Sequence, residues 1–368
     1  MESIWEHPPS GMEALESLCE SCLNAGASDL FLREGAVPFL RLGDQLIPLE
    51  TVPATDDLLG HLWSVCGANP DATDHDASLV TRSGLRFRVN LHRQLGVRGA
   101  VLRNIKTQIP TMEELGLPTE LLQKWFTRPS GLILVTGSTG TGKSTTLAAG
   151  LEWLNQTTTR HIITIEDPVE YLFQENLCRF TQREVGADTP SFAEGLRRAL
   201  RQSPDIILLG EIRDSVSAST ALQAAETGHL VLASVHSGSA AEAVERLHRI
   251  FSPAEREDAS ALLAAQLVGV FTQQLVRGLS KKLFLVAEHF ENQAATRQWI
   301  RNGGGTELVD FMQISQSPEN RSMTTSLVQA LRDGHISMEE ALAAAPMADE
   351  FRRAAMGISS QAFQVAQD

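Results

Sequence analysis

The fold is decided by the stretch Leu132-Ile133-Leu134-Val135-Thr136-Gly137-Ser138-Thr139-Gly140-Thr141-Gly142-Lys143-Ser144. Residues 137–144 fit the eight-residue phosphate-loop pattern, directly after an apolar run typical of a buried strand and before a helical segment at 145–155. Glycines let successive backbone N–H groups turn toward phosphates at the N-terminus of a helix, where the helix dipole also favours anions. We therefore expect a nucleotide site in which Lys143 faces the β- and γ-phosphates and the Ser144 hydroxyl faces Mg²⁺.

Two further apolar runs, at 161–167 and 205–211, end in carboxylates. The C-terminal ends of neighbouring parallel strands meet at one edge of a sheet, and phosphoryl transfer needs acids there for the metal and for the attacking water. We expect Glu166 and Glu211 to fill these two roles. The residues alone leave open which acid takes which role.

A third apolar run, at 230–235, lies between His229 and His236. On a fully extended segment the two rings would be about 23 Å apart and on opposite faces, so they cannot share one metal ion. His236, at the C-terminal end of the run, is a candidate for contact with the γ-phosphate. A purely structural histidine is the alternative interpretation.

Composition and charge exclude several classes of function. The 368 residues are 42% hydrophobic, enough for the cores of two or three domains. The 45 acidic and 31 basic side chains give a net charge of −14, which disfavours extended contact with nucleic acid phosphates. The acidity is uneven, because residues 1–80 carry 14 acids and two bases, whereas residues 81–106 carry seven bases and no acid.

The basic strip has two interpretations. Its arginines and lysine include Arg86, Arg88, Arg93, Arg98, Arg103 and Lys106. Strand alternation places Arg86 and Arg88 on one face and Phe87 and Val89 on the other. The strip is either a solvated strand face or a supply of arginine for a nucleotide, since an arginine delivered to the transferring phosphate can raise the rate about 10³- to 10⁵-fold.

Neither the N-terminus nor any apolar run indicates a targeting or membrane segment. The chain begins without the basic start and apolar segment of a signal peptide. Its longest apolar stretch, 261–271, is shorter than the roughly 20 residues that span a bilayer. We expect a cytoplasmic protein without direct membrane insertion. Among the four cysteines only Cys19 and Cys22 are close in sequence, which predicts buried thiols rather than a zinc or disulfide site.

The chain divides into four parts by pattern. Residues 1–106 combine a helix at 12–25 with short strand-like runs and predict a small α+β domain. Residues 107–118 are the candidate linker. In residues 119–290 apolar strands alternate with helices, which indicates an α/β fold with a parallel sheet flanked by helices. Residues 291–368 are mostly helical.

Together these motifs resemble those of a known family. The segments that carry the resemblance are Leu132 to Ser144, Ile163 to Glu170, Gln182 to Val185, Leu196 to Asp214 and Ala225 to His236. They match the Walker A motif, Asp box, Walker B motif and His box of the secretion ATPases. Within that superfamily the chain looks most like the PilT/PilU twitching-motility ATPases of type IV pili.

The resemblance implies a PAS-like N-terminal domain joined to a RecA-like P-loop ATPase core, with C-terminal helices and with six copies in a ring. ATP and Mg²⁺ would be the cofactors, ring deformation would extract pilin subunits, and an inner-membrane pilus platform protein would hold the ring at the membrane. By the same resemblance Glu166 would activate the water and Glu211 would hold Mg²⁺ together with Ser144. The N-terminal arginines of the family map onto Arg86, Arg88 and Arg103. The residues expected to contact nucleotide are Gly137, Ser138, Thr139, Gly140, Thr141, Gly142, Lys143, Ser144, Thr145, His229 and His236.

Departures from the family pattern keep a second function open. The C-terminal Ala-Ile-Arg-Asn-Leu-Ile motif is present only as Ala295-Thr296-Arg297-Gln298-Trp299-Ile300, and Ser237-Gly238 stands where paired threonines are usual. An accessory or regulatory nucleotide-binding ring component of a pilus or type II secretion machine, with weak hydrolysis, is therefore the alternative. Assembly-type relatives carry a four-cysteine zinc insertion, and the lack of a second cysteine in 178–290 favours the retraction type. A RecA-like DNA motor is disfavoured by the acidity of the chain and by the lack of an interleaved basic and aromatic stretch.

Overall fold

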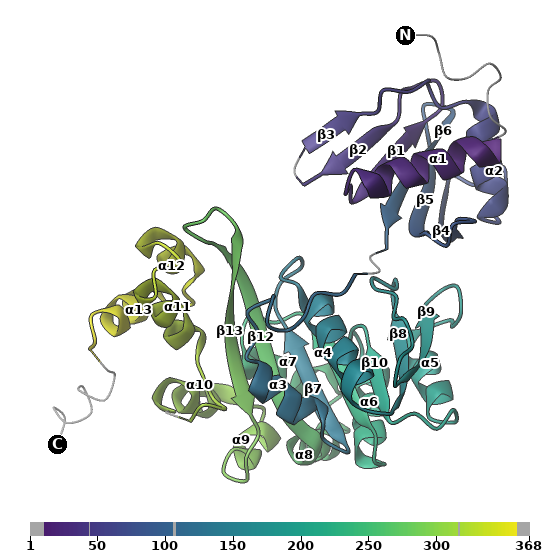
Figure 1. Cartoon of the computed structure of the whole chain (residues 1–368). Helices are drawn as coiled ribbons and strands as arrows, with labels where there is room; N and C mark the ends of the chain where they lie inside the picture. Colours follow the sequence, from purple (N-terminus) through teal and green to yellow (C-terminus); the bar gives the residue numbers. More distant parts are fainter. Residues whose placement is uncertain (1–10, 44, 106–107, 316, 359–368) are drawn as a thin grey trace, which may run out of the picture. The chain divides into compact units, whose positions relative to one another are not determined.

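The computed structural model describes residues 11–43, 45–105, 108–315 and 317–358, and the chain divides into two compact units (Figure 1). The N-terminal unit is Met1–Thr107 and the second is Gln108–Asp368. The α/β class is confirmed. The described residues do not include the first ten residues or the last ten. They also do not include Lys106 of the basic strip or Thr107 of the candidate linker. Residues 108–118 belong to the second unit, where Met112 and Leu117 are buried in its core.

The N-terminal unit is an antiparallel sheet with two helices on one face. Its elements are α1 (Gly11–Asn24), β1 (Asp29–Arg33), β2 (Phe39–Leu42), β3 (Gln45–Pro48), α2 (Asp56–Val65), β4 (Asp74–Val80), β5 (Arg86–Gln94) and β6 (Val97–Asn104), with strand order β3-β2-β1-β6-β5-β4. Apolar side chains of α1 and α2 share one core with the inward residues of the sheet, including Leu30, Phe87 and Leu102. The sequence patterns missed α2 and β4. Thr55 begins α2 by accepting a hydrogen bond from the backbone N–H of Leu58, as N-cap residues do.

The other face of this sheet carries a row of charged side chains. Residues paired directly across antiparallel strands share a face, and the register pairs Arg41 with Asp29, Asp29 with Arg103 and Arg103 with Arg88. Asp29 is buried, and its carboxylate accepts a hydrogen bond from Arg103 Nε at 2.7 Å. Phe87 lies buried on the helix side, so the expected alternation along β5 is confirmed.

The second unit is built on a seven-stranded, mostly parallel sheet, with strand order β13-β12-β7-β11-β10-β8-β9. Its elements up to the last strand are α3 (Thr119–Phe126), β7 (Gly131–Thr136), α4 (Lys143–Thr157), β8 (His161–Glu166), β9 (Arg179–Glu184), α5 (Phe192–Ala199), β10 (Ile206–Leu209), α6 (Ser215–Glu226), β11 (Leu230–Val235), α7 (Ala240–Ile250), α8 (Arg256–Gln266), β12 (Leu267–Arg277) and β13 (Leu283–Glu291). Only β13 pairs antiparallel, with β12. The expected strands β7, β8, β10 and β11 are confirmed, whereas β9, β12 and β13 were not foreseen.

Helices cover both faces of this sheet, as Figure 1 shows. Along β7, Leu132 and Leu134 face the core shared with α5, α6, α7 and α8, whereas Ile133 and Val135 face the core shared with α3 and α4. All six residues of β7 are buried. Burying each large apolar side chain contributes about 1.5–3 kcal/mol, so this central strand holds the two helical layers together.

The described residues that follow β13 are mostly helical, as expected. The helices are α9 (Arg297–Arg301), α10 (Gly305–Ile314), α11 (Met323–Arg332), α12 (Met338–Ala344) and α13 (Ala348–Ala355). The last three pack together against Val276 and Val286 of the β12–β13 hairpin. Among the described residues, no helix combines the length and the apolar character needed to cross a membrane.

All four cysteines are free thiols, and the predicted burial of Cys19 and Cys22 is confirmed. Cys19, Cys22 and Cys178 are buried, and Cys66 is half-buried. Burial raises the pKa of Cys19 to about 12. Thiols that remain protonated inside a core are poor nucleophiles and poor metal ligands, so they have a packing role.

Candidate active site

The phosphate loop joins β7 to α4 at one edge of the seven-stranded sheet. Gly137, directly after β7, has φ +144°, and Gly142, directly before α4, has φ +88°, a region that L side chains rarely adopt. A Cβ atom on Gly137 would also lie 2.5 Å from the carbonyl oxygen of Gln273. Glycine is therefore needed at both ends of the loop, because a side chain would force the loop away from β12.

The loop borders a cavity of about 400 Å³. Of the residues expected at the site, the cavity is lined by Thr139, Gly140, Gly142, Lys143, Ser144, Thr145, Glu166, Glu211 and His236. The strands β8, β10 and β11 that end at these acids and at His236 are parallel neighbours, so their carboxyl ends meet at one edge. Gly137, Ser138 and Thr141 were also expected to contact nucleotide, but they shape the loop without lining the cavity.

The ammonium group of Lys143 is bound by the loop itself. Its Nζ atom donates to the carbonyl oxygens of Gly137 at 2.9 Å and of Ser138 at 2.8 Å. Burial lowers the pKa of Lys143. The loop thus holds the Lys143 ammonium group next to its own backbone. A phosphate that binds there would replace the two neutral carbonyl acceptors by charged oxygen atoms, which form stronger hydrogen bonds.

Glu166 is a buried acid at the end of β8. Its side chain is 8% exposed, and its Oε1 atom accepts a hydrogen bond from Thr164 Oγ1 at 2.6 Å. Burial raises the pKa of Glu166 to about 7. A carboxylate with a pKa near neutrality is suited to accept a proton, since it is ionised at working pH yet more basic than an exposed glutamate.

Glu211 is held by two basic side chains. Arg213 Nε donates to its Oε2 atom at 2.7 Å, and His236 Nε2 lies 3.5 Å from its Oε1 atom. The same guanidinium donates from Nη1 to Asp167 Oδ2 at 3.1 Å and lies 5.5 Å from the centre of the Phe192 ring. The hydrogen bond to Glu211 raises the pKa of Arg213. Arg213 therefore bridges the two acidic segments that border the cavity.

His229 does not join the site within one copy of the chain. It precedes β11, and its Nδ1 atom lies 3.0 Å from the carbonyl oxygen of Ala224, so it is held at the amino end of a strand whose carboxyl end carries His236. Of the two box histidines, only His236 lines the cavity. Arg86, Arg88 and Arg103 belong to the N-terminal unit, whereas every residue that lines this cavity belongs to the second unit.

The family model of type II/IV secretion system proteins matches residues 72–361 of this chain. The chain belongs to that family. Its members are NTPases of secretion and pilus machines, and the chain is a PilT/PilU-like member.

Three of the similar proteins are pilus ATPases. The type IV pilus ATPase PilU of Pseudomonas aeruginosa is 37% identical over 349 residues, which cover 92% of this chain and 90% of that protein. The type IV pilus retraction ATPase PilT of the same species is 36% identical over 332 residues, covering 89% and 96%. A crystal structure of the pilus retraction motor PilT with bound ADP matches 92% of this chain and 99% of that chain, at 36% identity and a TM-score of 0.84.

The site of this secretion ATPase includes residues that the sequence analysis missed. The cavity is also lined by Asp167, Pro168, Glu170, Phe192, Gly210, Arg213 and Ser234. Spacing could have indicated Asp167, next to Glu166, and Arg213, two residues after Glu211. Gln273 gave no such signal. It lies buried on β12 beneath the loop, where its Nε2 atom donates to the carbonyl oxygen of Thr141 at 2.5 Å.

The donor atoms of this secretion ATPase fit Mg²⁺ bound together with phosphate. Ser144 and Glu211 offer a hydroxyl and a carboxylate oxygen to the same cavity. Mg²⁺ prefers oxygen ligands, keeps several waters and usually takes only one or two carboxylates besides the substrate phosphates. In the described part of the chain no cluster of three or more His, Cys, Asp or Glu could hold a metal by itself. The nucleotide would thus have to complete the site.

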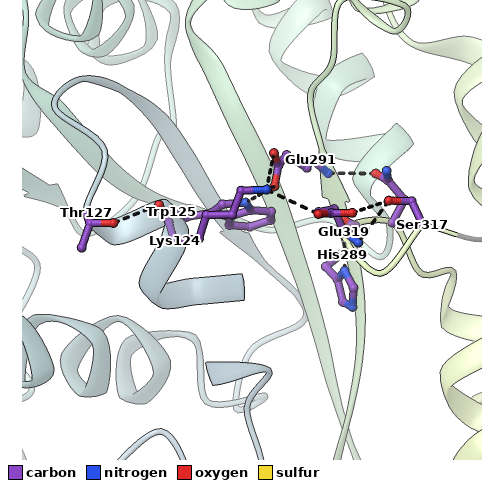
Figure 2. A network of polar contacts seen from close by, with 8 residues as sticks. Lys124, Trp125, Thr127, His289, Glu291, Ser317 and Glu319 are labelled. Atoms are coloured by element: carbon purple, nitrogen blue, oxygen red, sulfur yellow. Dashed lines mark hydrogen bonds and ion pairs between the residues drawn. The ribbon is translucent and has the colours of Figure 1, made fainter. Parts of the chain in front are cut away.

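A polar network supports the helix layer next to the loop. Figure 2 shows Lys124 and Trp125 of α3 converging on Glu291 of β13, with Lys124 Nζ and Trp125 Nε1 each 2.9 Å from Glu291 Oε2. Next to them, Phe126 packs on Gly150 of α4 so closely that a Cβ atom on this glycine would lie 2.0 Å from its ring. The network therefore fixes the position of α3, and α3 in turn supports α4, the helix that begins at Lys143.

Proposed function

We propose that this chain is the subunit of a homohexameric, Mg²⁺-dependent ATPase that powers type IV pilus retraction. The observation that carries the proposal is the convergence of the phosphate loop, Glu166, Glu211 and His236 around one cavity, in a chain 36–37% identical to pilus ATPases over about nine-tenths of its length. ATP is the expected nucleotide because the similar motor PilT has been crystallised with bound ADP.

Each residue has a role that its surroundings support. Lys143 would exchange the two loop carbonyls for the β- and γ-phosphates, while the backbone N–H groups at the start of α4 bind the same phosphates. Glu166 would accept a proton from the attacking water, because burial keeps its pKa near neutrality. Ser144 and Glu211 would hold Mg²⁺, which when bound offsets the charge on the phosphate oxygens.

The remaining roles involve other copies and partners. In a ring of six, Arg86, Arg88 and Arg103 would supply positive charge to a nucleotide, and His229 would be free to act outside the cavity of its own copy. An inner-membrane pilus platform protein would hold the ring, and the motor would work in the cytoplasm at the membrane through that partner. The similarity to PilU and PilT supports these assignments.

Hydrolysis and assembly test the proposal directly. The purified chain should hydrolyse ATP only with Mg²⁺ and should have the mass of a hexamer in light scattering. Glu166→Gln should keep nucleotide binding and lose hydrolysis about 10²- to 10⁴-fold, as expected for loss of a general base. Wild-type protein that binds ATP without hydrolysing it would overturn the motor assignment.

An accessory ring component is the second candidate, favoured by the altered segment 295–300. Thr296, in place of the usual isoleucine, is fully buried, and its hydroxyl donates to Asn292 Oδ1 at 2.9 Å, so this segment has its own local packing at the start of α9. In a strain that lacks the gene, a Glu166→Gln copy that restores twitching motility would favour the accessory role. A copy that fails to restore it would favour the motor.

A further inference from the structure

Arg213 stands between the two acidic segments of the cavity, and no role has been assigned to it so far. Its Nε atom occupies Glu211 Oε2 at 2.7 Å, and Glu211 is the carboxylate proposed to hold Mg²⁺. The other oxygen, Oε1, faces His236 Nε2 at 3.5 Å. Both oxygens of this acid therefore already face nitrogen atoms of basic side chains, and a metal ion at either oxygen would compete with one of them.

A guanidinium and a divalent cation compete for the same carboxylate oxygen. A charge-assisted hydrogen bond to a carboxylate is among the stronger hydrogen bonds in proteins, and like charges within a few ångströms repel. The Glu211 side chain is only 14% exposed, so water screens this repulsion weakly. Arg213 in its present position therefore opposes the binding of Mg²⁺, or of one of its waters, to Glu211, and its movement away from Oε2 would make that oxygen fully available.

The structure also provides a position for the released guanidinium. Arg213 Nη1 is 3.1 Å from Asp167 Oδ2, and the guanidinium carbon lies 5.5 Å from the centre of the Phe192 ring. The hydrogen bond to Asp167 uses Nη1 and the bond to Glu211 uses Nε, so the side chain can lose one partner and keep two.

We propose that Arg213 is a positioning residue that occupies the Glu211 carboxylate until a metal–nucleotide complex arrives. Glu211 then exchanges its contact with Arg213 for one with Mg²⁺. The proposal rests on the proposed function, since it takes Glu211 as a metal ligand. It explains why the cavity carries an arginine next to the acid. Metal binding without nucleotide is made unfavourable, and metal and nucleotide enter the site together.

The test is the coupling between Mg²⁺ and nucleotide binding, measured without hydrolysis. A fluorescent, non-hydrolysable ATP analogue is titrated into the protein once with excess EDTA and once with saturating Mg²⁺. The coupling is the Kd measured in EDTA divided by the Kd measured in Mg²⁺. In Arg213→Gln the ratio should rise about tenfold or more, which corresponds to about 1.4 kcal/mol. Without Arg213, the Glu211 carboxylate is available to Mg²⁺, so the metal–nucleotide complex binds more tightly. In EDTA the same carboxylate is left unpaired and repels the nucleotide phosphates, so the metal-free nucleotide binds more weakly.

Matched variants separate this role from a structural one. Arg197→Gln, which removes an exposed arginine paired with Glu194 at 2.9 Å outside the cavity, should leave the ratio unchanged. Arg213→Lys should raise the ratio less than Arg213→Gln does. It replaces Arg213→Gln as the test variant if Arg213→Gln fails to fold. In a Glu211→Gln background, Arg213→Gln should have no further effect, because the competition acts through that carboxylate.

The outcomes are distinct. If Arg213→Gln weakens binding equally with and without Mg²⁺, Arg213 is a structural residue and the proposal is wrong. If the ratio falls, Arg213 presents Glu211 to the metal and the proposal is also wrong. A wild-type protein that binds no nucleotide would overturn the proposed function as well, whereas wild-type coupling with an unchanged ratio in Arg213→Gln would overturn this inference alone.

Discussion

The two sheets of this chain collect charged residues in different ways. In the second unit, parallel strands end at one edge, so residues from Thr139 to His236 border a single cavity. In the N-terminal unit, antiparallel strands bring Arg88, Arg103 and Arg41 into one row across a face, with Asp29 among them. The first arrangement lines a cavity that a ligand can enter, whereas the second presents charge across a face of the sheet.

The difference lies in what fixes the charges. Lys143 and Glu211 are positioned by the sheet edge, the loop and neighbouring side chains that border the same cavity. Arg103, whose side chain is two-thirds exposed, is fixed mainly by the buried carboxylate of Asp29. We therefore expect substitutions at the sheet edge to remove hydrolysis outright, and substitutions in the arginine row to have graded effects.

The largest effect is expected for Lys143→Ala. This variant removes the charge that would meet the β- and γ-phosphates, and turnover should fall about 10³-fold or more. Steady-state ATP hydrolysis measures the effect, with Lys282→Ala on the exposed turn before β13 as a control that keeps wild-type turnover. Hydrolysis that survives in Lys143→Ala would show that another site is responsible.

Neutralising Arg86, Arg88 or Arg103 should reduce turnover about 10²-fold or more while changing the Tm little, because an arginine near the transferring phosphate acts on the transition state. The comparison of kcat with Tm for the three single alanine variants checks this. Unchanged kcat in all three would show that the basic strip is only a solvated strand face.

The pH dependence should reveal Glu166. Burial raises its pKa to about 7, so the carboxyl is protonated below that pH and cannot accept a proton. At saturating ATP, kcat should therefore rise about tenfold per pH unit below 7 and level off above it. A flat profile between about pH 5.5 and 8.5 would contradict the role of Glu166 as a base, and Glu166→Gln should abolish the slope.

The smallest effect is expected for Asp29→Asn. The amide can still accept a hydrogen bond from Arg103 but lacks the charge, so we expect a loss of about 1–3 kcal/mol in the free energy of unfolding and a few-fold loss in kcat. Denaturant titration measures the free energy of unfolding, and steady-state ATP hydrolysis measures kcat. Adding Asp29→Asn to Arg103→Ala should reduce kcat no further, and a further loss would show that Asp29 acts independently of Arg103.

Much of the site could be predicted from sequence because its residues follow apolar strands. Gly137 to Ser144, Glu166 and Glu211 each end a run whose composition indicates a buried parallel strand, and topology then brings them together. The partners of those residues could not be found this way. That Arg213 turns back onto Glu211 depends on side-chain packing against Phe192 and Asp167, which has no period in the sequence.

The missed strands have a similar cause. In β12 the polar pair Thr272 and Gln273 interrupts the apolar pattern, although both side chains are buried. They are buried because they bind the neighbouring strand and loop, with the Thr272 hydroxyl accepting a hydrogen bond from Thr136 Oγ1 at 2.8 Å. A pattern based on hydrophobicity cannot recognise a polar residue that is buried for its hydrogen bonds.

The position of Gln273 has a consequence for the order in which the chain is synthesised. Thr141, whose carbonyl oxygen it binds, leaves the ribosome 132 residues before it. Until β12 has been made, β7 lacks its neighbour on that side, and a mostly apolar strand with unpaired backbone groups is prone to aggregate. A growing chain that already contains the whole phosphate loop is therefore expected to need a chaperone, and ribosome-bound chains ending before residue 267 should capture one more strongly than chains ending after 291.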